Sequence, residues 1–521
     1  MAAPIKKNTL FYGDNLQILR EYIADESVDL IYLDPPFNSK RTYNVLFKDE
    51  SGDDSAAQIA AFDDTWHWDA SAEEAYHELV TEAPDEVSKL IGALREFIGT
   101  NQMMAYLVMM AIRLVELHRV LKPTGSLYLH CDPTASHYLK IVLDAIFGAE
   151  NFRNEIIWHY RRWTNSQSQF QSMHDVILFY SRTSENTFNF TEVDMSASQR
   201  KKFERGWDSN VIHTKDRKYA QLIVYKREKL EQAVASGKMN LDKYENIVYR
   251  DKPVVAASDV IIMPVLNSQA KERLGYPTQK PVALLERIIR ASSNEGEVVL
   301  DPFCGCGTSI AAAEKLDRKW IGIDITHLAI TLQKNRLRES FPEVEFGVVG
   351  EPETVEAARY LAEEIGRFQF EWWALSLVRA KPVKATKGSK RGKKGADKGI
   401  DGVITFIDGA RRKPQRVLVQ VKSGKVSSRD IRDLVGTVER EKAVLGVFIT
   451  LEKPSKPMRT EAVSAGFYES LLWGGSYPKI QILTIEELLA GAKVEMPTAI
   501  RAFKKAERIQ KNAPTQGQMN L

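Results

Sequence analysis

The sequence predicts an α/β protein, in which a sheet has helices on both faces and a smaller C-terminal α/β domain follows. Three observations indicate this. Short apolar runs alternate with stretches whose apolar residues recur at helical spacing, the pattern of a parallel sheet wrapped by helices. The 521 residues, 44% of them hydrophobic, are enough for two or more sizeable cores. The alternation pauses twice, at about 184–270 and at 381–398, where the chain is polar and basic.

The expected elements can be placed by these patterns. Before the first pause they are a buried strand at 28–33, a helix at 107–121, a strand at 126–130 and a helix reaching residue 146. The Lys-Pro-Thr-Gly segment at 122–125 is expected to end the first of these helices. After it they are a helix at 282–292, a strand at 298–300, a helix at 308–316 and a strand at 320–323. Beyond the second pause, three strands of a separate unit are expected at 402–406, 416–421 and 445–450.

Composition excludes several classes of protein. No apolar run is long enough to span a bilayer and the N-terminus has no secretory signal, so we expect a cytoplasmic protein without membrane contact. The three cysteines are too few for a disulfide framework. The net charge of +3 identifies no partner, because an acidic stretch at 49–86 with 13 Asp and Glu offsets the two basic ones.

A glycine-rich loop lies between two of the predicted elements. Asp301–Ser309 (DPFCGCGTS) joins a strand to a helix, and Gly305 and Gly307 allow a sharp turn and a close approach to a ligand. The next strand ends in Asp324, where an acid can hold ribose hydroxyls. This order of elements favours a nucleoside-binding half-site over an ordinary turn. Two cysteines in the loop complete no zinc site by themselves.

A second cluster, Asp34-Pro35-Pro36-Phe37, directly follows the strand at 28–33. The prolines fix a rigid loop at the carboxyl end of a strand, where open α/β sheets place their sites. Asp34 and the Pro35 carbonyl can accept the two N–H groups of a planar amine, and Phe37 can stack on its ring. Such acceptors draw a delocalised nitrogen toward tetrahedral geometry as it attacks, which is orientational and electrostatic catalysis.

These motifs resemble those of DNA amino-methyltransferases that use S-adenosylmethionine. Asp34–Phe37 is similar to the family's catalytic DPP(Y/F) motif and Phe303–Gly307 to its FxGxG motif, in the order of the β class. The blocks at 12–15, 174–180 and 276–281 agree, so the resemblance spans about 8–345. It implies a Rossmann-like methyltransferase sheet and the following cofactor-binding residues: Asp14 (toward the cofactor adenine), Asp34, Thr278, Lys280, Asp301, Phe303, Gly305, Gly307, Thr308 and Asp324.

The acid of the catalytic motif favours adenine N6 as the target, with N4 of cytosine as the alternative. A base inside duplex DNA must be flipped out to reach it. By position, 184–270 resembles the family's target-recognition region, and it carries basic and aromatic residues: Arg200, Lys201, Lys202, Arg205, Lys215, Arg217, Lys218, Lys226 and Arg227, with Trp207, Tyr219 and Tyr225. The expected partner is double-stranded DNA, RNA remains open, and a homodimer is compatible with the family. Residues 66–68 and 161–163 could fill the gap left by a flipped base or could be packing residues.

The C-terminal unit resembles a second family. Asp401, then Gln420 and Lys422 on one strand, are similar to the PD-(D/E)xK nuclease core in its Mrr-like variant, where Gln replaces an acid. The resemblance implies that Asp401 and Gln420 hold Mg²⁺ while Lys422 orients the attacking water, with Glu371 as a further ligand. We favour an active endonuclease, and thus restriction–modification, over a domain that only binds DNA.

The expected division of the chain has four parts. They are the methyltransferase at 1–350, connecting helices and a basic linker at 351–398, the nuclease-like domain at 399–490 with its first helix at about 366–380, and a polar tail at 491–521. The tail ends in Gln518–Leu521, which is similar to the short peptides that dock on bacterial sliding clamps. A frayed, solubilising tail is the interpretation that we favour over clamp docking.

Overall fold

The computed structural model describes residues 3–36, 42–48, 54–63, 68–161, 168, 170–195, 197–214, 217–250, 252, 254–267, 270–274, 276, 278–382, 400–408, 414–470 and 474–497. Several sequence-based expectations lie outside these residues. They concern Phe37, residues 66–67 and 162–163, Lys215, most of the basic linker, and the tail with its clamp-like peptide at 518–521.

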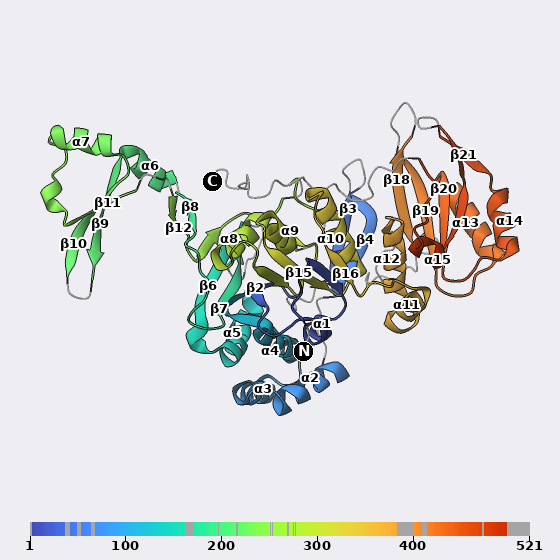
Figure 1. Ribbon diagram of the computed structural model, residues 1–521, viewed down its shortest axis with the longest axis horizontal. Coiled ribbons are helices and arrows are strands. Elements are labelled where there is room, and N and C mark those ends of the chain that lie inside the picture. The colour runs from blue at the N-terminus through green and yellow to red at the C-terminus, as the bar shows by residue number, and fades with distance from the viewer. Residues whose placement is uncertain are drawn as a thin grey trace. The chain divides into compact units, whose positions relative to one another are not determined.

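A nine-stranded sheet forms the core of the methyltransferase part (Figure 1). Its strands are, in spatial order, β13 (Val260–Ile262), β6 (Phe152–His159), β7 (His174–Ser181), β5 (Leu121–Cys131), β2 (Val28–Leu33), β14 (Val298–Asp301), β15 (Lys319–Asp324), β1 (Thr9–Tyr12) and β16 (Gly347–Val349). The run β5-β2-β14-β15-β1 is parallel, whereas β7 is antiparallel to both of its neighbours. The α/β fold class is confirmed, but the expectation of a wholly parallel sheet is wrong at β7.

Helices cover both faces of this sheet, as the sequence predicts. One face is packed by α1 (Asn15–Tyr22), α4 (Gln102–Val120) and α5 (Pro133–Phe147), over which α2 (Ala70–Thr81) and α3 (Asp85–Ile98) lie. The other is packed by α8 (Val282–Ser292), α9 (Thr308–Lys315) and α10 (His327–Ser340). The core strand β2 is buried along its whole length, which explains its continuous apolar run.

One boundary differs from expectation. Residues 122–125 were expected to separate a helix from a strand, but α4 ends at Val120 and β5 begins at once with Leu121. The register between β2 and β5 shifts from Val28↔Leu121 to Leu30↔Ser126, so the Lys-Pro-Thr-Gly segment forms a bulge within the strand.

Phe188–Asp259 forms a compact unit of its own. It contains β8 (Glu192–Asp194), α6 (Ala197–Arg205), β9 (Trp207–His213), β10 (Lys218–Val224), α7 (Arg227–Ala235), η2 (Leu241–Lys243), β11 (Asn246–Tyr249) and β12 (Val254–Ala256). A small core around Leu222, Val224 and Leu230 holds it together. The unit lies within the segment that the sequence singles out for DNA recognition.

The C-terminal part contains a five-stranded sheet, in the order β17 (Lys381–Pro382), β18 (Gly402–Ile407), β19 (Pro414–Lys422), β20 (Leu445–Thr450) and β23 (Ile480–Thr484). It also contains α11 (Val355–Tyr360), α12 (Arg367–Leu377), α13 (Ser428–Arg440), α14 (Lys456–Ser464), β21 (Phe467–Glu469), β22 (Ser476–Pro478) and α15 (Ile485–Leu489). The three strands and the first helix expected from the sequence are present. Helix α12 contributes Phe370 and Trp373 to this domain's core, while Trp372 packs beside Tyr276 and Leu328 of the methyltransferase part.

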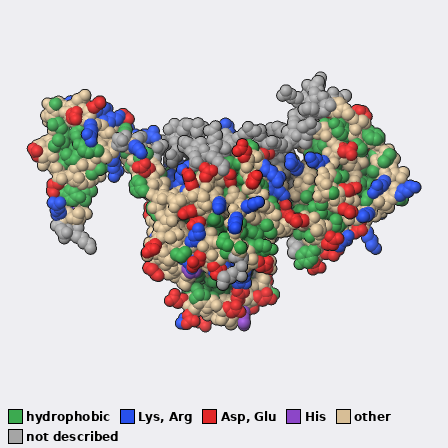
Figure 2. All heavy atoms as spheres, viewed as in Figure 1, with side chains coloured by type: hydrophobic (Ala, Val, Ile, Leu, Met, Phe, Trp, Pro, Cys, Tyr) green, Lys and Arg blue, Asp and Glu red, His purple; other side chains and the backbone are tan. Residues whose placement is uncertain are grey.

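The described part of the acidic stretch begins at β4 (Asp54–Asp63), which pairs with the preceding strand β3 (Thr42–Lys48). It continues through α2 to the start of α3, and acidic side chains gather over these two helices in Figure 2. None of the helices formed by the described residues is long and apolar enough to cross a membrane.

Candidate active site

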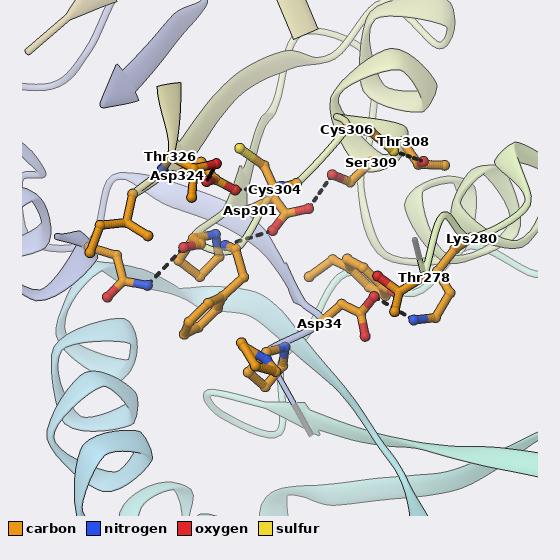
Figure 3. A pocket seen from close by; sticks show the side chains of 18 of the residues that line it. Asp34, Thr278, Lys280, Asp301, Cys304, Cys306, Thr308, Ser309, Asp324 and Thr326 are labelled. Atoms are coloured by element: carbon orange, nitrogen blue, oxygen red, sulfur yellow. Dashed lines mark hydrogen bonds and ion pairs between the residues drawn. The ribbon is translucent and has the colours of Figure 1, made fainter. Parts of the chain in front are cut away.

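Loops at one edge of the nine-stranded sheet enclose a cavity of about 370 Å³ (Figure 3). Because β1, β2, β14 and β15 are parallel, the loops after them all lie at this edge, which we call the carboxyl edge. Most of the predicted site residues line the cavity: Asp14, Asp34, Pro35, Pro36, Thr278, Lys280, Asp301, Phe303, Gly305, Thr308 and Asp324. Gly307 lies just behind the wall, at the start of α9.

The glycine loop adopts the turn that its residues allow. Gly305 and Gly307 have φ of +48° and +71°, the left-handed region that other residues rarely occupy. A Cβ at Gly307 would lie 2.8 Å from the Gln333 side chain, so no larger residue fits there without displacing it. The Gly305 N–H donates to the Asp324 carboxylate at 2.9 Å, and Gln333 donates to the Gly305 carbonyl at 2.8 Å. These two hydrogen bonds fix the conformation of the loop beside the cavity.

Two carboxyl groups beside this loop have raised pKa values. Burial raises the pKa of Asp324 to about 6, although the N–H groups of Gly305 and Thr326 and the Thr326 hydroxyl donate to its carboxylate. Burial also raises the pKa of Asp301 to about 7, against hydrogen bonds from Ser309 and the Phe303 N–H. Asp324 lies where an acid would accept from ribose hydroxyls, and Asp301 supports the loop itself.

The wall formed after β1 depends on an arginine that sequence reasoning did not assign to the site. Arg113 of α4 donates to the Asp14 carboxylate at 2.8 Å and to the Asn15 side chain at 2.5 Å, and Asn15 donates to the Pro302 carbonyl at 2.8 Å. The other oxygen of Asp14 caps α1, accepting from the Leu16 N–H at 2.8 Å. Both oxygens of the Asp14 carboxylate therefore have structural partners in addition to the predicted contact with an adenine ring.

Asp34 forms an ion pair with a lysine in the wall of the cavity. Lys280, almost fully buried, donates to one carboxylate oxygen of Asp34 at 2.5 Å, and Figure 3 shows the two side chains pointing toward each other. Thr278, two residues before, has a φ of +61°, a strained conformation for a residue with a Cβ. The segment before α8 thus reaches over the catalytic motif, as the sequence blocks predict, and Lys280 neutralises the charge of Asp34.

The cysteines of the glycine loop are structural. Cys304 and Cys306 are buried, and burial raises the pKa of both thiols. Within the part of the chain that the structure describes, no three His, Cys, Asp or Glu side chains are grouped so as to hold a metal ion.

The cavity fits a nucleoside joined to a charged amino-acid group. A glycine cradle, an acid at the end of the second strand and an apolar wall that includes Phe303 and Met109 suit an adenosine. The Asp34–Lys280 pair lies at the other side of the same cavity and supplies both signs of charge. The residues present therefore fit S-adenosylmethionine.

The C-terminal residues are arranged differently. Asp401 is buried beside β19, where its carboxylate accepts from the Val421 N–H at 2.7 Å. Gln420 is buried, and no described group hydrogen-bonds to its side-chain oxygen. Lys422 ends β19, and Glu371 is buried on α12. The described residues form no acidic cluster suited to a metal here, so the Mg²⁺ site expected at Asp401 and Gln420 gains no support from the structure.

These features together define a nucleoside-dependent group-transfer enzyme. They are an α/β sheet with a glycine-rich loop, an acid positioned to bind a ribose, and an Asp-Pro-Pro loop. The sequence model of the N6_N4_Mtase family, described as DNA methylase, matches residues 28–335, more than half of the chain. The chain therefore belongs to this DNA methylase family.

Curated relatives agree over the same region. The chain is 27% identical over 350 residues to the type II methyltransferase M.EcaI of Enterobacter cloacae, a match that covers 61% of this chain and 67% of the relative. It is 27% identical over 331 residues to the DNA adenine methyltransferase YhdJ of Escherichia coli K12, covering 63% and 82%. Among solved structures, the cytosine-N4-specific PvuII DNA methyltransferase matches with 13% identity and a TM-score of 0.36, covering 63% of this chain and 86% of that one.

A second family model matches residues 387–490, that of the NACHT-associated inactive restriction endonuclease 1. The C-terminal domain is thus restriction endonuclease-like, as the sequence predicts. Its similarity is to a family described as inactive, which gives the expected Mg²⁺-dependent endonuclease no support.

Proposed function

We propose that this protein transfers a methyl group from S-adenosylmethionine to N6 of adenine in duplex DNA, as the modification enzyme of a restriction–modification system. The observation that supports it most directly is the cavity in which Asp34 and Pro35 share one space with the glycine cradle and Asp324. When bound there, S-adenosylmethionine supplies a methyl carbon attached to a positively charged sulfur.

The residues of the chain hold and orient the two reactants. The backbone of 305–307 lies against the adenosine part, and Asp324 accepts from its ribose hydroxyls. The Pro35 carbonyl and the Asp34 carboxylate accept from the target amine, which directs its lone pair toward the methyl carbon. Lys280, already bonded to one oxygen of Asp34, leaves the other oxygen for the amine. Phe37 is proposed to stack on the flipped base.

The 188–259 unit is proposed to recognise the DNA sequence. Exposed Lys and Arg side chains lie on α6 and at the start of β10. Cations of the unit also lie over aromatic rings, among them Arg205 over Trp207 and Arg227 at 4.3 Å from the ring centre of Tyr249. Several of the predicted DNA contacts also pair with acids of the unit, such as Lys202 with Asp208 at 2.8 Å and Arg217 with Glu245 at 2.9 Å. DNA phosphates would have to replace these acids, which costs little for the Arg217–Glu245 pair because both of its side chains are exposed.

Adenine is proposed over cytosine because the catalytic motif begins with an acid. The relatives include both an enzyme named for adenine and one named for cytosine N4, so they favour neither base. Duplex DNA incubated with the protein and methyl-labelled S-adenosylmethionine, then digested to nucleosides, decides the question. We expect label in N6-methyladenine, and label in N4-methylcytosine would replace the adenine assignment. Single-molecule sequencing of DNA from expressing cells adds the sequence context.

For the C-terminal domain, a role in DNA binding without cleavage has more support than an endonuclease. Gln420 replaces an acid, the Asp401 carboxylate accepts from its own sheet, and the family matched is described as inactive. Several exposed cations follow β19 and β20 at their carboxyl ends, among them Lys425, Lys453 and Lys456, and such a surface suits phosphates.

Plasmid incubated with the full-length protein and Mg²⁺ separates these two functions. We expect no nicks or breaks on DNA with or without methylated sites. Cleavage by the wild type that Asp401→Ala and Lys422→Ala abolish would instead establish the endonuclease.

A further inference from the structure

Four polar side chains lie in a row across the sheet beside the catalytic loop. Tyr32 pairs with Tyr128 across β2 and β5, and His130, two residues on, points to the same face. His130 pairs with Ile177 of β7, and Asp175, two residues before, again shares that face. The fourth is Tyr160, just beyond β6. Four segments far apart in the sequence therefore bring these groups together at the carboxyl edge.

Hydrogen bonds connect the row without a gap. The Tyr32 hydroxyl lies 2.9 Å from Nδ1 of His130, and Nε2 of His130 lies 3.2 Å from Oδ2 of Asp175. The Tyr160 hydroxyl donates to the other oxygen of Asp175 at 2.7 Å. His130 has no exposed surface, and Trp158 packs edge-on against its ring. Packing and hydrogen bonds together fix the imidazole in one orientation.

The ionisation of Asp175 determines which atom donates and which accepts in each hydrogen bond of this row. Burial alone would raise the pKa of Asp175, but hydrogen bonds from His130 and Tyr160 and the charge of Lys280 hold it at about 2. An ionised carboxylate only accepts, so Nε2 of His130 carries a hydrogen. In the neutral imidazole Nδ1 is then the acceptor, and the Tyr32 hydroxyl donates to it. A carboxylate that orients an imidazole, which in turn accepts from a hydroxyl, is the arrangement by which proteins activate hydroxyl groups.

The Tyr32 end of this hydrogen-bonded row lies at the active-site cavity. Tyr32 lines the same cavity as Asp34, which stands two residues later on the same strand end. The negative charge of Asp34 also acts on the Tyr32 hydroxyl. Nothing in the proposed binding of cofactor or base uses this tyrosine.

We propose that Tyr32, His130 and Asp175 form a proton relay that takes up the proton released by the target amine, with Tyr32 as the group that meets the amine and His130 and Asp175 as positioning residues. This inference rests on the proposed methyl transfer and adds the route by which its proton leaves.

The step balances as follows. Transfer joins the amine nitrogen to the methyl carbon, and the electron pair of the broken carbon–sulfur bond remains on a neutral thioether. The nitrogen is then positively charged and must lose a proton. The N–H that was bonded to Asp34 turns to the Tyr32 oxygen and gives its proton to it as the Tyr32 proton moves to Nδ1 of His130, giving an imidazolium beside the Asp175 carboxylate. When the methylated base leaves, the same two transfers run in reverse and water takes the proton.

His130 is surrounded by groups from three strands. Tyr32 bonds to it from β2 and Asp175 from β7, and Trp158 of β6 packs against its ring, while Tyr160 beyond β6 bonds to Asp175 and packs on Trp158. The charge of Lys280 acts on Asp175, and that of Asp34 acts on Tyr32. Among these, only Asp175 bonds directly to the side of the imidazole away from the active site, so its replacement isolates the relay.

Tyr32→Phe tests the relay, and Tyr128→Phe is its matched control. Tyr128 is the register partner of Tyr32, equally buried, and its hydroxyl contacts Ser292 at 2.6 Å instead of a histidine. We expect Tyr32→Phe to slow single-turnover methyl transfer about 100-fold with unchanged S-adenosylmethionine affinity, and Tyr128→Phe to leave both within about threefold. Equal rates for the two variants would overturn the proposal.

Asp175→Asn provides a readout that a purely structural role would not change. Because the carboxylate stabilises the imidazolium, its loss should shift the acidic limb of the single-turnover rate profile by about one pH unit to lower pH, and lower the plateau. In the cofactor-free protein, ¹⁵N NMR of labelled histidines, with the His130 signal assigned through His130→Gln, should show hydrogen on Nε2 in the wild type. Hydrogen on Nδ1, or a pH profile identical to that of the wild type, would contradict the relay.

Failure of the relay and failure of the proposed function give different results. A wild type that methylates no DNA removes the proposed function. A wild type that methylates DNA while Tyr32→Phe keeps its full rate removes only the relay. The tautomer measurement needs no activity, so it tests the geometry independently of the kinetic variants.

Discussion

The molecule has two sheets that each carry candidate chemistry at the carboxyl ends of parallel strands, and the two edges differ in what surrounds those residues. At the edge of β2, β14 and β15 the side chains border a cavity of about 370 Å³, and residues from six separate segments meet there. At the edge of β19 the carboxylate of Asp401 is buried and accepts from the neighbouring Val421 N–H.

The two edges show that a residue can match a sequence motif without lying in a site suited to the chemistry of that motif. Both Asp34 and Asp401 occupy the positions that their sequence motifs predict. Asp34 has a cationic partner on one oxygen and a cavity beside it, whereas Asp401 accepts from its own sheet and its neighbour Gln420 contributes no charge. A carboxylate already used by the backbone binds a metal less well than one held between other acids.

The largest expected effect, and the most direct test of this comparison between the two edges, is that of Asp34→Ala. It removes an acceptor for the amine and leaves Lys280 buried without its carboxylate, so we expect single-turnover transfer to fall at least about 100- to 1,000-fold. Binding of S-adenosylmethionine, measured by equilibrium dialysis, should change by less than about tenfold. Asp144→Ala, which removes an acid paired with Lys140 on α5, serves as the control and should keep the wild-type rate.

Arg113→Met should have the next largest effect, on stability and cofactor binding together. The arginine is buried, and its loss leaves Asp14 and Asn15 without a shared partner. We expect the free energy of unfolding to fall by about 3 kcal/mol and the Kd for S-adenosylmethionine to rise about tenfold. Arg20→Met removes two pairs that are more exposed and should cost less than about 1 kcal/mol. Equal losses for both variants would contradict a special role for Arg113.

Cofactor affinity should depend on pH through Asp324. Burial raises the pKa of this carboxyl to about 6, and only its ionised form accepts from two ribose hydroxyls. Lowering the pH from 7 to 5 should therefore weaken S-adenosylmethionine binding about tenfold. A raised folded-state pKa of an acid also means that the cofactor-free protein loses stability from this group as pH rises from about 4 to 6. Asp324→Asn should remove both dependences, and a binding curve that is flat with pH in the wild type would contradict the assignment.

The smallest expected effect concerns the second edge. Lys425→Gln and Lys456→Gln remove exposed cations that follow β19 and β20, so each should lower the salt dependence of DNA binding by about one unit of slope and weaken affinity severalfold. Lys442→Gln, before β20 and at the opposite edge, should change neither quantity. Unchanged salt dependence in all three variants would leave the C-terminal domain without a role in DNA binding.

Much of the fold could be predicted from sequence because its signals are local. The buried strand at Val28–Leu33 and the strand–loop–helix around Gly305 are each specified by a short, continuous segment, and both are present. The bulge at 122–125 could not be predicted, since a Pro-Gly segment indicates a stop unless a neighbouring strand holds it in the sheet. The antiparallel course of β7 likewise depends on which strands become its neighbours.

The site divides in the same way. Asp34, Gly305 and Asp324 were identified from sequence because their chemistry requires particular residues next to a strand end. Arg113 carried only a faint signal, a cation that interrupts an apolar helix. Asp175 lies in the block at 174–180 that resembles the family, but nothing in that block indicated a role for it, and His130 carried no signal because it is an ordinary residue in its strand.

By itself, the sequence determined the two α/β domains, the order of the motifs and the residues that can approach a methyl donor and an amine. Only the tertiary structure decided which of those residues share a cavity, and it set Asp34 against Lys280, tied Asp14 to Arg113 and placed Asp401 in its own sheet. The physical reason is that motifs specify local backbone, whereas the partners of a buried polar group come from segments distant in the chain. Desolvation makes those partners obligatory, and sheet order selects them.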